Sequence, residues 1–148
     1  MIRVQGLHKS FRRGPEVIHV LKGLELEVGA GEGVAVIGAS GTGKSTLLHL
    51  LGGLERPDEG RIFYDDTDIC GMREGPLADL RNRKLGFVFQ FHFLLPEFTA
   101  LENVMIPALV GAWNRPQARS RALTLLDTVG LSARLTHKPG ELSGGEQQ

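Results

Sequence analysis

The stretch "GASGTGKST", residues 38–46, has the residue types and spacing of a phosphate-binding loop. It matches the pattern G-x-x-x-x-G-K-[ST], which begins at Gly38 and reaches its second fixed glycine at Gly43. Glycine at these positions and at Gly41 leaves the backbone bare, so the chain can wrap closely around a triphosphate. Successive amide N–H groups then point inward and form an anion-binding nest.

The residues that close this pattern predict how the phosphates and a metal ion are held. Lys44 is expected to reach the β- and γ-phosphates, and the Ser45 hydroxyl is expected to take one Mg²⁺ position. Thr46 can add a further phosphate contact. The candidate phosphate-binding residues are Gly38, Ala39, Ser40, Gly41, Thr42, Gly43, Lys44, Ser45 and Thr46.

Such a loop needs a buried strand before it and a helix after it, and the sequence predicts both. Residues 33–38 are apolar on both faces, which is typical of a buried parallel strand. Residues 44–54 are apolar nearly all round and predict a helix that Gly52 and Gly53 end. Residues 85–89 predict a second buried strand. Together these elements favour an α/β domain with a largely parallel sheet, preceded by antiparallel strands over the first 28 residues.

The chain becomes mostly helical after Gln90, and helix-capping pairs mark where the helices start. Thr99 with Glu102 forms one capping pair, before a helix that Pro107 bends or ends. Asn114 caps a second helix, which Gly130 closes. A third capping pair opens a helix at the end of the chain and consists of Ser143 and Glu146.

Composition excludes several classes of protein. Lys plus Arg and Asp plus Glu number 17 each over 148 residues and are interspersed, so a nucleic-acid partner is not indicated. The single cysteine, Cys70, cannot form an internal disulfide, which fits a reducing compartment. No apolar run is long enough to span a membrane.

Two further segments allow more than one interpretation. Asp65, Asp66 and Asp68 have the residue type of a metal site, but a solvated hairpin turn is the favoured interpretation. The aromatic stretch "FQFHFLLPEF", residues 89–98, fits a docking surface and core packing equally well.

Taken together, "GASGTGKST", Gln90 at the end of "LGFVFQ", and "LSGGEQQ" resemble the ATP-binding-cassette (ABC) ATPases in type and order. The resemblance covers essentially the whole chain. It implies a P-loop NTPase fold with an antiparallel β subdomain and a helical subdomain. It also implies ATP and Mg²⁺ as ligands.

The resemblance assigns roles that spacing alone leaves open. Phe11 becomes the aromatic residue that stacks on adenine, and Gln90 becomes a contact to Mg²⁺ and water that senses the γ-phosphate. Ser143, Gly144 and Gly145 become part of the signature that faces the nucleotide of a second ATPase subunit. The implied catalytic residues are Lys44 and Gln90, and the implied metal contacts are Ser45 and Gln90.

Within the family, "QFHFLLPEFTALENV" and "ELSGGEQQ" are most similar to the ATPases of lipoprotein-releasing systems, the LolD type. This similarity implies a head-to-tail ATPase dimer that works with two integral membrane subunits. Its implied place is peripheral, on the cytoplasmic side of the bacterial inner membrane. ATPases of macrolide-efflux or cell-division complexes are the alternatives, and an ATPase acting on DNA or ribosomes is disfavoured by the short helical segment.

The resemblance also implies that catalytic elements lie beyond Gln148, because the family's Walker-B Asp, catalytic Glu, D-loop and switch His follow the signature. We therefore expect one incomplete ABC ATPase domain, with a β subdomain and P-loop core at 1–89, a Q-loop and helical subdomain at 90–142, and the start of the signature helix at 143–148. The 148 residues alone are expected not to turn over ATP. A nucleotide-binding fragment without hydrolysis remains an alternative.

Overall fold

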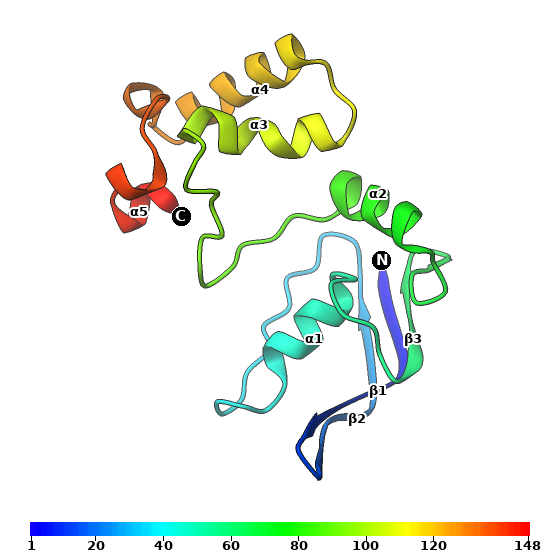
Figure 1. The fold of residues 1–148 in the computed structure, drawn as a ribbon. Helices are drawn as coiled ribbons and strands as arrows, with labels where there is room; N and C mark the ends of the chain where they lie inside the picture. Colours follow the sequence, from blue (N-terminus) through cyan, green and yellow to red (C-terminus); the bar gives the residue numbers. More distant parts are fainter. The chain divides into compact units, whose positions relative to one another are not determined.

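The computed structural model describes all residues from 1 to 148 and divides into two compact units. The first unit is Met1–Arg81 and the second is Asn82–Gln148 (Figure 1). Helix α2, Glu74–Lys84, runs across this boundary. Each unit is described by itself below.

The first unit contains a four-stranded antiparallel sheet, as the sequence predicts for the N-terminal part. Its strands are β1 (Ile2–Arg13), β2 (Glu16–Val28), β3 (Glu59–Tyr64) and β4 (Thr67–Asp68), and their order in the sheet is β2-β1-β3-β4. Strand β1 lies between β2 and β3 and pairs with both. The sheet therefore carries one long central strand on which the rest of the unit is built.

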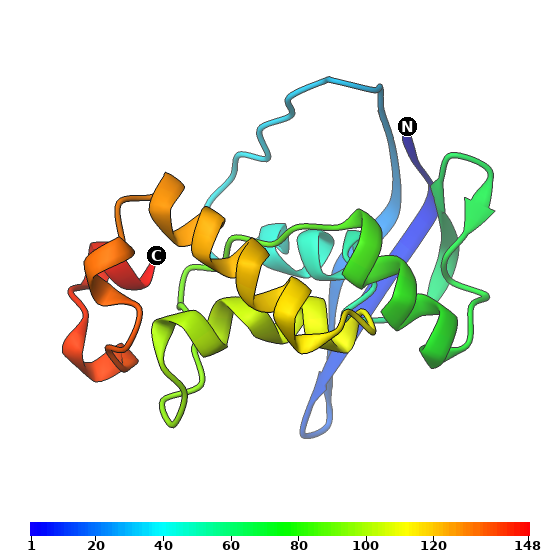
Figure 2. The same cartoon turned by 90° about the horizontal axis from the view of Figure 1, so that it is seen from above.

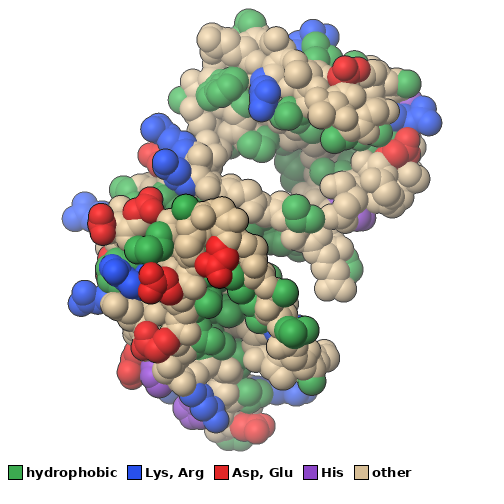
Figure 3. All heavy atoms as spheres, turned by 180° about the vertical axis from the view of Figure 1, so that it is seen from behind, with side chains coloured by type: hydrophobic (Ala, Val, Ile, Leu, Met, Phe, Trp, Pro, Cys, Tyr) green, Lys and Arg blue, Asp and Glu red, His purple; other side chains and the backbone are tan.

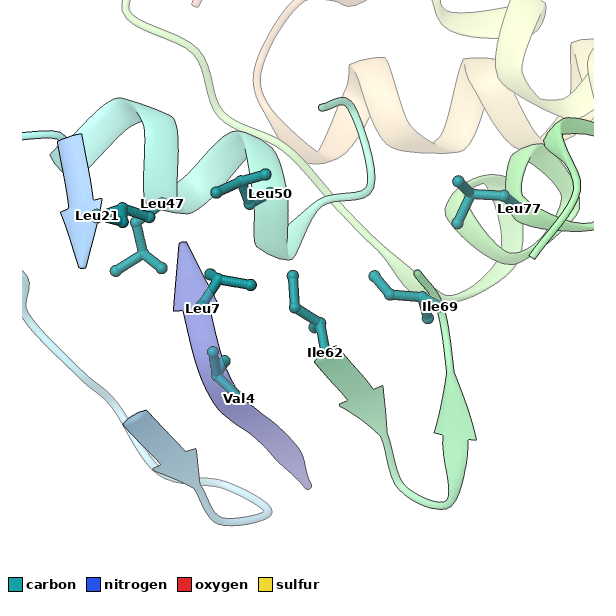
Figure 4. Close-up of a cluster of buried hydrophobic side chains, with 8 residues drawn as sticks. All are labelled: Val4, Leu7, Leu21, Leu47, Leu50, Ile62, Ile69 and Leu77. Carbon is teal, nitrogen blue, oxygen red and sulfur yellow. The ribbon is translucent and has the colours of Figure 1, made fainter. Parts of the chain in front are cut away.

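Helix α1, Lys44–Leu51, packs on this sheet through leucines from every third or fourth position (Figure 4). Leu47 and Leu50 are buried and meet Leu7 and Leu21 of the two longest strands. Burying a leucine side chain contributes about 1.5–3 kcal/mol, so these contacts fix α1 on the sheet. The complete buried cluster is Val4, Leu7, Leu21, Leu47, Leu50, Ile62, Ile69 and Leu77.

The second unit is built on two helices, α3 (Ala100–Val110) and α4 (Arg115–Thr128), which lie side by side in both ribbon views (Figures 1 and 2). Met105 of α3 and Ala118 and Ala122 of α4 form their buried contact. Two short 3₁₀ turns, Ser132–Arg134 and Pro139–Glu141, lead to α5, Gly144–Gln147. None of the helices in the chain is long and apolar enough to cross a membrane.

The predicted helix caps are confirmed. Thr99 and Glu102 form a reciprocal capping box, and the Asn114 side chain accepts a hydrogen bond from the Gln117 amide. Helix α3 continues through Pro107 to Val110, so this proline does not end it.

The two predicted parallel strands are not formed, and this prediction is wrong for the structure of these residues. Residues 33–38 and 85–89 have no strand structure. Ile37 is 93% exposed and Val88 is 87% exposed. A strand needs a neighbour to accept and donate its backbone hydrogen bonds, and neither segment pairs with any strand of the sheet. Figure 2 shows the stretch that follows β2 as an extended connection without a neighbouring strand.

Replacing Leu50 with alanine is expected to destabilise the first unit. Leu50 is fully buried, so Leu50→Ala removes transfer free energy and leaves a cavity, at a cost of about 2–5 kcal/mol. Leu48 on the same helix is 56% exposed, and Leu48→Ala is the matched control with an expected effect within about 0.5 kcal/mol. Urea denaturation followed by circular dichroism measures both, and equal losses would contradict the packing described here.

Candidate nucleotide-binding site

The predicted phosphate loop is an exposed turn that leads directly into α1. The Lys44 ammonium group lies within the loop and donates hydrogen bonds to the carbonyl oxygens of Gly38, at 3.0 Å, and Ala39, at 2.6 Å. The Thr42 hydroxyl donates to the same Ala39 oxygen at 2.9 Å. The loop therefore folds around its own lysine, and no carboxylate of the chain pairs with that cation.

Glycine is required at the junction between loop and helix. Gly43 caps the N-terminus of α1 with φ of 94°, in the left-handed region that side chains disfavour. A Cβ atom on Gly43 would lie 2.5 Å from Cγ1 of Val20 on β2. The junction must therefore approach strand β2 closely, and only glycine allows that approach.

The loop leaves a row of backbone donors without partners. From residue 40 to residue 46 no amide N–H group donates a hydrogen bond within the chain, and the first to do so is that of Leu47, to Gly43. The first amides of any α-helix lack partners within the helix, and the helix dipole adds positive potential at the same end. With the Lys44 ammonium group beside them, these amides suit the phosphate groups of a nucleotide.

The two predicted hydroxyl ligands lie on the first turn of α1. Ser45 is exposed, Thr46 is half-buried, and neither side chain makes a hydrogen bond. Both hydroxyls are thus free for a ligand. A Mg²⁺ position shared by Ser45 and Gln90 stays a prediction, because Gln90 belongs to the second unit.

Phe11 lies near the tip of the β1–β2 hairpin with 40% of its surface exposed. The Lys9 ammonium group stands 5.3 Å from the centre of its ring. Lys9 is itself buried and is held by Glu55 at 2.7 Å and Asp58 at 3.7 Å. This ion-pair cluster gives the Phe11 ring a cationic neighbour that is fixed to the sheet. The adenine-stacking role of Phe11 stays a prediction.

Gln90 lies in an exposed bend within a group of aromatic side chains. The Phe89 ring stacks on Phe87 at 5.3 Å between centres and meets Phe93 edge-on at 5.2 Å. Phe91 and Phe93 are 69% and 72% exposed. For these two residues core packing is therefore wrong, and their exposure favours the docking interpretation.

The predicted capping box at the end of the chain is confirmed. The Ser143 hydroxyl oxygen accepts from the Glu146 amide at 3.3 Å, and the Ser143 amide donates to the Glu146 carboxylate at 2.8 Å. Arg134 donates to the same carboxylate at 2.9 Å. The Ser143 amide and then Arg134 lower the pKa of Glu146 to about 2. Gly144 and Gly145 are exposed with open space around them.

The lowered pKa of Glu146 determines the pH range in which its carboxylate stabilises the capping box. A carboxylate whose pKa is lower in the folded chain stabilises the fold at pH values above its ordinary pKa. That contribution is lost as the pH falls from about 4.5 toward 2. The exposed signature turn is therefore fully held at neutral pH.

The aspartates after β3 form a turn, which confirms the favoured interpretation. Asp65 has φ of 52° in the β3–β4 hairpin and pairs with the N-terminal amine at 2.9 Å. Asp68 accepts from the Cys70 amide and pairs with Arg61. No group of three or more His, Cys, Asp or Glu side chains in the chain could hold a metal ion.

Three supporting residues were not predicted from the sequence: Val20, Lys9 and Arg134. Val20 sets the approach of Gly43, and Lys9 sits beside Phe11. Arg134 holds Glu146 from twelve residues earlier in the chain. Local patterns carry no sign of these contacts, because each depends on how separate segments pack.

Comparison with known proteins identifies relatives over the whole chain. It is 59% identical over 148 residues to a lipoprotein-releasing system ATP-binding protein LolD from Syntrophotalea carbinolica, and 55% identical to a LolD protein from Pseudomonas syringae pv. tomato. Both alignments cover 100% of this chain and 65% of the relative. The chain therefore spans about two thirds of the length of these relatives.

Solved structures of ATP-binding cassettes match the fold of this chain. A dimeric ATP-binding cassette in a post-hydrolysis state, bound to ADP and Pi, matches with a TM-score of 0.91 and 38% identity. A dimeric bacterial ABC transporter cassette matches equally well. Each match covers 99% of this chain and 65% of the other. Residues 21–148 also match the family model described as ABC transporter. With its phosphate loop, its signature turn and these relatives, the chain belongs to the ABC transporter family.

Proposed function

We propose that this chain is the ATP-binding part of the ATPase of a lipoprotein-releasing ABC transporter. The observation that carries the proposal is the 54–59% identity over all 148 residues to proteins named as LolD. The phosphate loop supports it, because its lysine and unpartnered amides suit a nucleotide.

The first unit supplies the contacts to the triphosphate. The amides of residues 40–46 bind phosphate oxygens, and Lys44 exchanges its two carbonyl partners for the β- and γ-phosphates. The Ser45 hydroxyl is the ligand for Mg²⁺, which when bound would neutralise charge on the phosphates. Phe11 stacks on the base, with Lys9 holding the hairpin tip beside it.

The signature turn completes the site of a second subunit. Ser143, Gly144 and Gly145 are exposed and held by the Glu146 capping box, so the Ser143 hydroxyl and the Gly144 and Gly145 amides can meet a phosphate across a dimer. The dimeric ATP-binding cassettes among the solved relatives support this arrangement. We place two such subunits head to tail, each with its phosphate loop against the signature of the other.

Hydrolysis belongs to the whole protein in this proposal, and not to these residues alone. Phosphoryl transfer needs a metal held from two sides and a positioned water. Among these residues we assign Ser45 and Gln90 to the metal, and Gln90 alone to the water. The 148 residues should therefore bind ATP without turning it over.

Transport requires a contact through which a conformational change on nucleotide binding is transmitted to the membrane subunits. The exposed aromatic residues after Gln90, including Phe91 and Phe93, are the surface that we assign to that contact. The partners are two integral membrane subunits, and the place of the ATPase is the cytoplasmic face of the inner membrane. The names of the relatives favour lipoprotein release over macrolide efflux and cell division.

Replacing Lys44 with alanine is expected to weaken ATP binding about 10- to 100-fold, because a charge-assisted contact to the phosphates is lost. Lys22→Ala is the matched control, since Lys22 is exposed on β2 outside the loop. Titration with a fluorescent ATP analogue in the presence of Mg²⁺ measures both variants. Equal affinity of Lys44→Ala and the parent chain would remove the proposed phosphate site.

Replacing Ser143 with arginine is expected to leave ATP affinity unchanged and to abolish ATP-dependent self-association. The arginine would fill the space where the phosphates of the second subunit must enter. Ser120→Arg, at an exposed position of α4, is the control that keeps self-association. Sedimentation velocity with and without ATP reads the dimer, and a Ser143→Arg dimer of normal strength would contradict the composite site.

Co-expression with candidate membrane subunits tests the transport assignment. The chain is expected to co-purify with the membrane subunits of a lipoprotein-releasing complex and not with those of a macrolide-efflux or cell-division complex. Phe91→Asp with Phe93→Asp should reduce the retained amount at least tenfold, because apolar contact area is lost. Phe11→Ala is the control that keeps retention, and stronger retention by an efflux complex would overturn the assignment.

A further inference from the structure

The turn between α3 and α4 exposes large apolar side chains. Val110 is 72% exposed, Trp113 is 49% exposed and Leu109 is 39% exposed. Figures 1 and 2 show this connection at one end of the helical pair. We call residues 109–121 the α3–α4 corner.

Basic side chains follow these apolar ones without any acidic neighbour in the sequence. Arg115, Arg119 and Arg121 are exposed, and none of them makes an ion pair or a side-chain hydrogen bond. From residue 103 to residue 126 the chain has no Asp or Glu. In Figure 3 hydrophobic and basic side chains, with a few acidic ones, occur on the part of the molecule that α3 and α4 form.

The end of α2 brings further positive charge to the same place. The Asn82 side chain donates to the carbonyl oxygen of Pro107 at 2.8 Å, which ties the end of α2 to the last turn of α3. Arg83 and Lys84 follow Asn82 directly and are exposed. Two further exposed cations therefore follow directly in sequence after the residue that contacts the corner.

The corner is also held in one shape. The Trp113 amide donates to the Ala108 carbonyl at 3.0 Å, and Asn114 caps α4 directly after it. A Cβ atom on Gly111 would lie 2.6 Å from the Asn82 side-chain oxygen, so the turn is closely packed beneath. Val110 and Trp113 thus project from a fixed turn.

We propose that the α3–α4 corner docks on an anionic lipid surface. The apolar side chains enter the boundary between headgroups and acyl chains, where tryptophan is favoured, and the arginines meet lipid phosphates. Each basic residue near an anionic membrane strengthens binding by about fivefold at physiological salt. The contact gives an ATPase subunit an attachment to the membrane that is independent of its nucleotide site and of Phe91 and Phe93.

A lipid surface fits the corner better than a protein does. The apolar residues lie on a turn at the end of two helices, so they can enter the headgroup boundary of a lipid surface without a preformed pocket. The cations of α4 extend over about 9 Å of its axis, from Arg115 to Arg121, and lie on more than one side of it, so their summed charge matches an anionic surface more readily than one acidic side chain. An acidic protein is the competing occupant, and the experiment separates the two.

Trp113 is the only tryptophan of the chain, so its fluorescence reports on the corner directly. With vesicles of phosphatidylglycerol and phosphatidylcholine, its emission is expected to shift to shorter wavelength. Pure phosphatidylcholine vesicles should cause no shift. Raising the salt from about 0.1 M to about 0.5 M should weaken the binding, because the charges are screened.

Two variants and one control test whether the arginines and the apolar residues of the α3–α4 corner are needed for vesicle binding. Arg115→Gln, Arg119→Gln and Arg121→Gln together should weaken partitioning on the order of a hundredfold. Val110→Asp, which keeps all the arginines, should also abolish the shift. Arg12→Gln with Arg13→Gln removes exposed charge from the β1–β2 hairpin and should leave it unchanged. Circular dichroism confirms that each variant keeps its helices.

Three results would overturn the proposal. The first is no shift with anionic vesicles, and the second is an equal shift with pure phosphatidylcholine. The third is a shift with poly-glutamate but none with vesicles, which would assign the corner to an acidic protein. Loss of ATP binding in Lys44→Ala leaves this test untouched, so the two proposals can fail separately.

Discussion

The close approach of Gly43 to Val20 is the constraint that fixes the phosphate loop in this chain. A side chain at position 43 would collide with β2, so the start of α1 must lie directly against the sheet. Leu47 and Leu50 then continue the contact along the helix. Packing thus holds the first turn of α1, whose first amides have no partner within the chain, next to the Lys44 ammonium group. In the proposed nucleotide site these amides are therefore held in place before any nucleotide arrives, whereas Lys44 must leave its two carbonyl partners.

The need for a neighbouring strand decides which apolar segments of the chain form strands. Apolar sequence is enough to predict that residues 33–38 and 85–89 belong in a sheet, but it does not supply their neighbours. The four strands present satisfy each other and leave both segments exposed. The chain spans about two thirds of its relatives, and within it the antiparallel sheet and the phosphate loop form without the parallel strands.

The parts that could be predicted from sequence are those that depend on nearby residues. Thr99 with Glu102, Asn114 with Gln117 and Ser143 with Glu146 each close over three positions, and all are present. The contacts between Val20 and Gly43 and between Arg134 and Glu146 join separate segments, so no local pattern reveals them. Exposure of the α3–α4 corner is likewise a property of how two helices pack, and not of their sequence periodicity.

The central claim is that the amides of residues 40–46, with Lys44, form the nucleotide site. Hydrogen–deuterium exchange of these amides, with and without ATP and Mg²⁺, tests it most directly. They have no partner within the chain, so they should exchange rapidly alone and become protected when ATP is bound, while α4 is unchanged. Unchanged exchange from residue 40 to residue 46 at saturating ATP would contradict the claim.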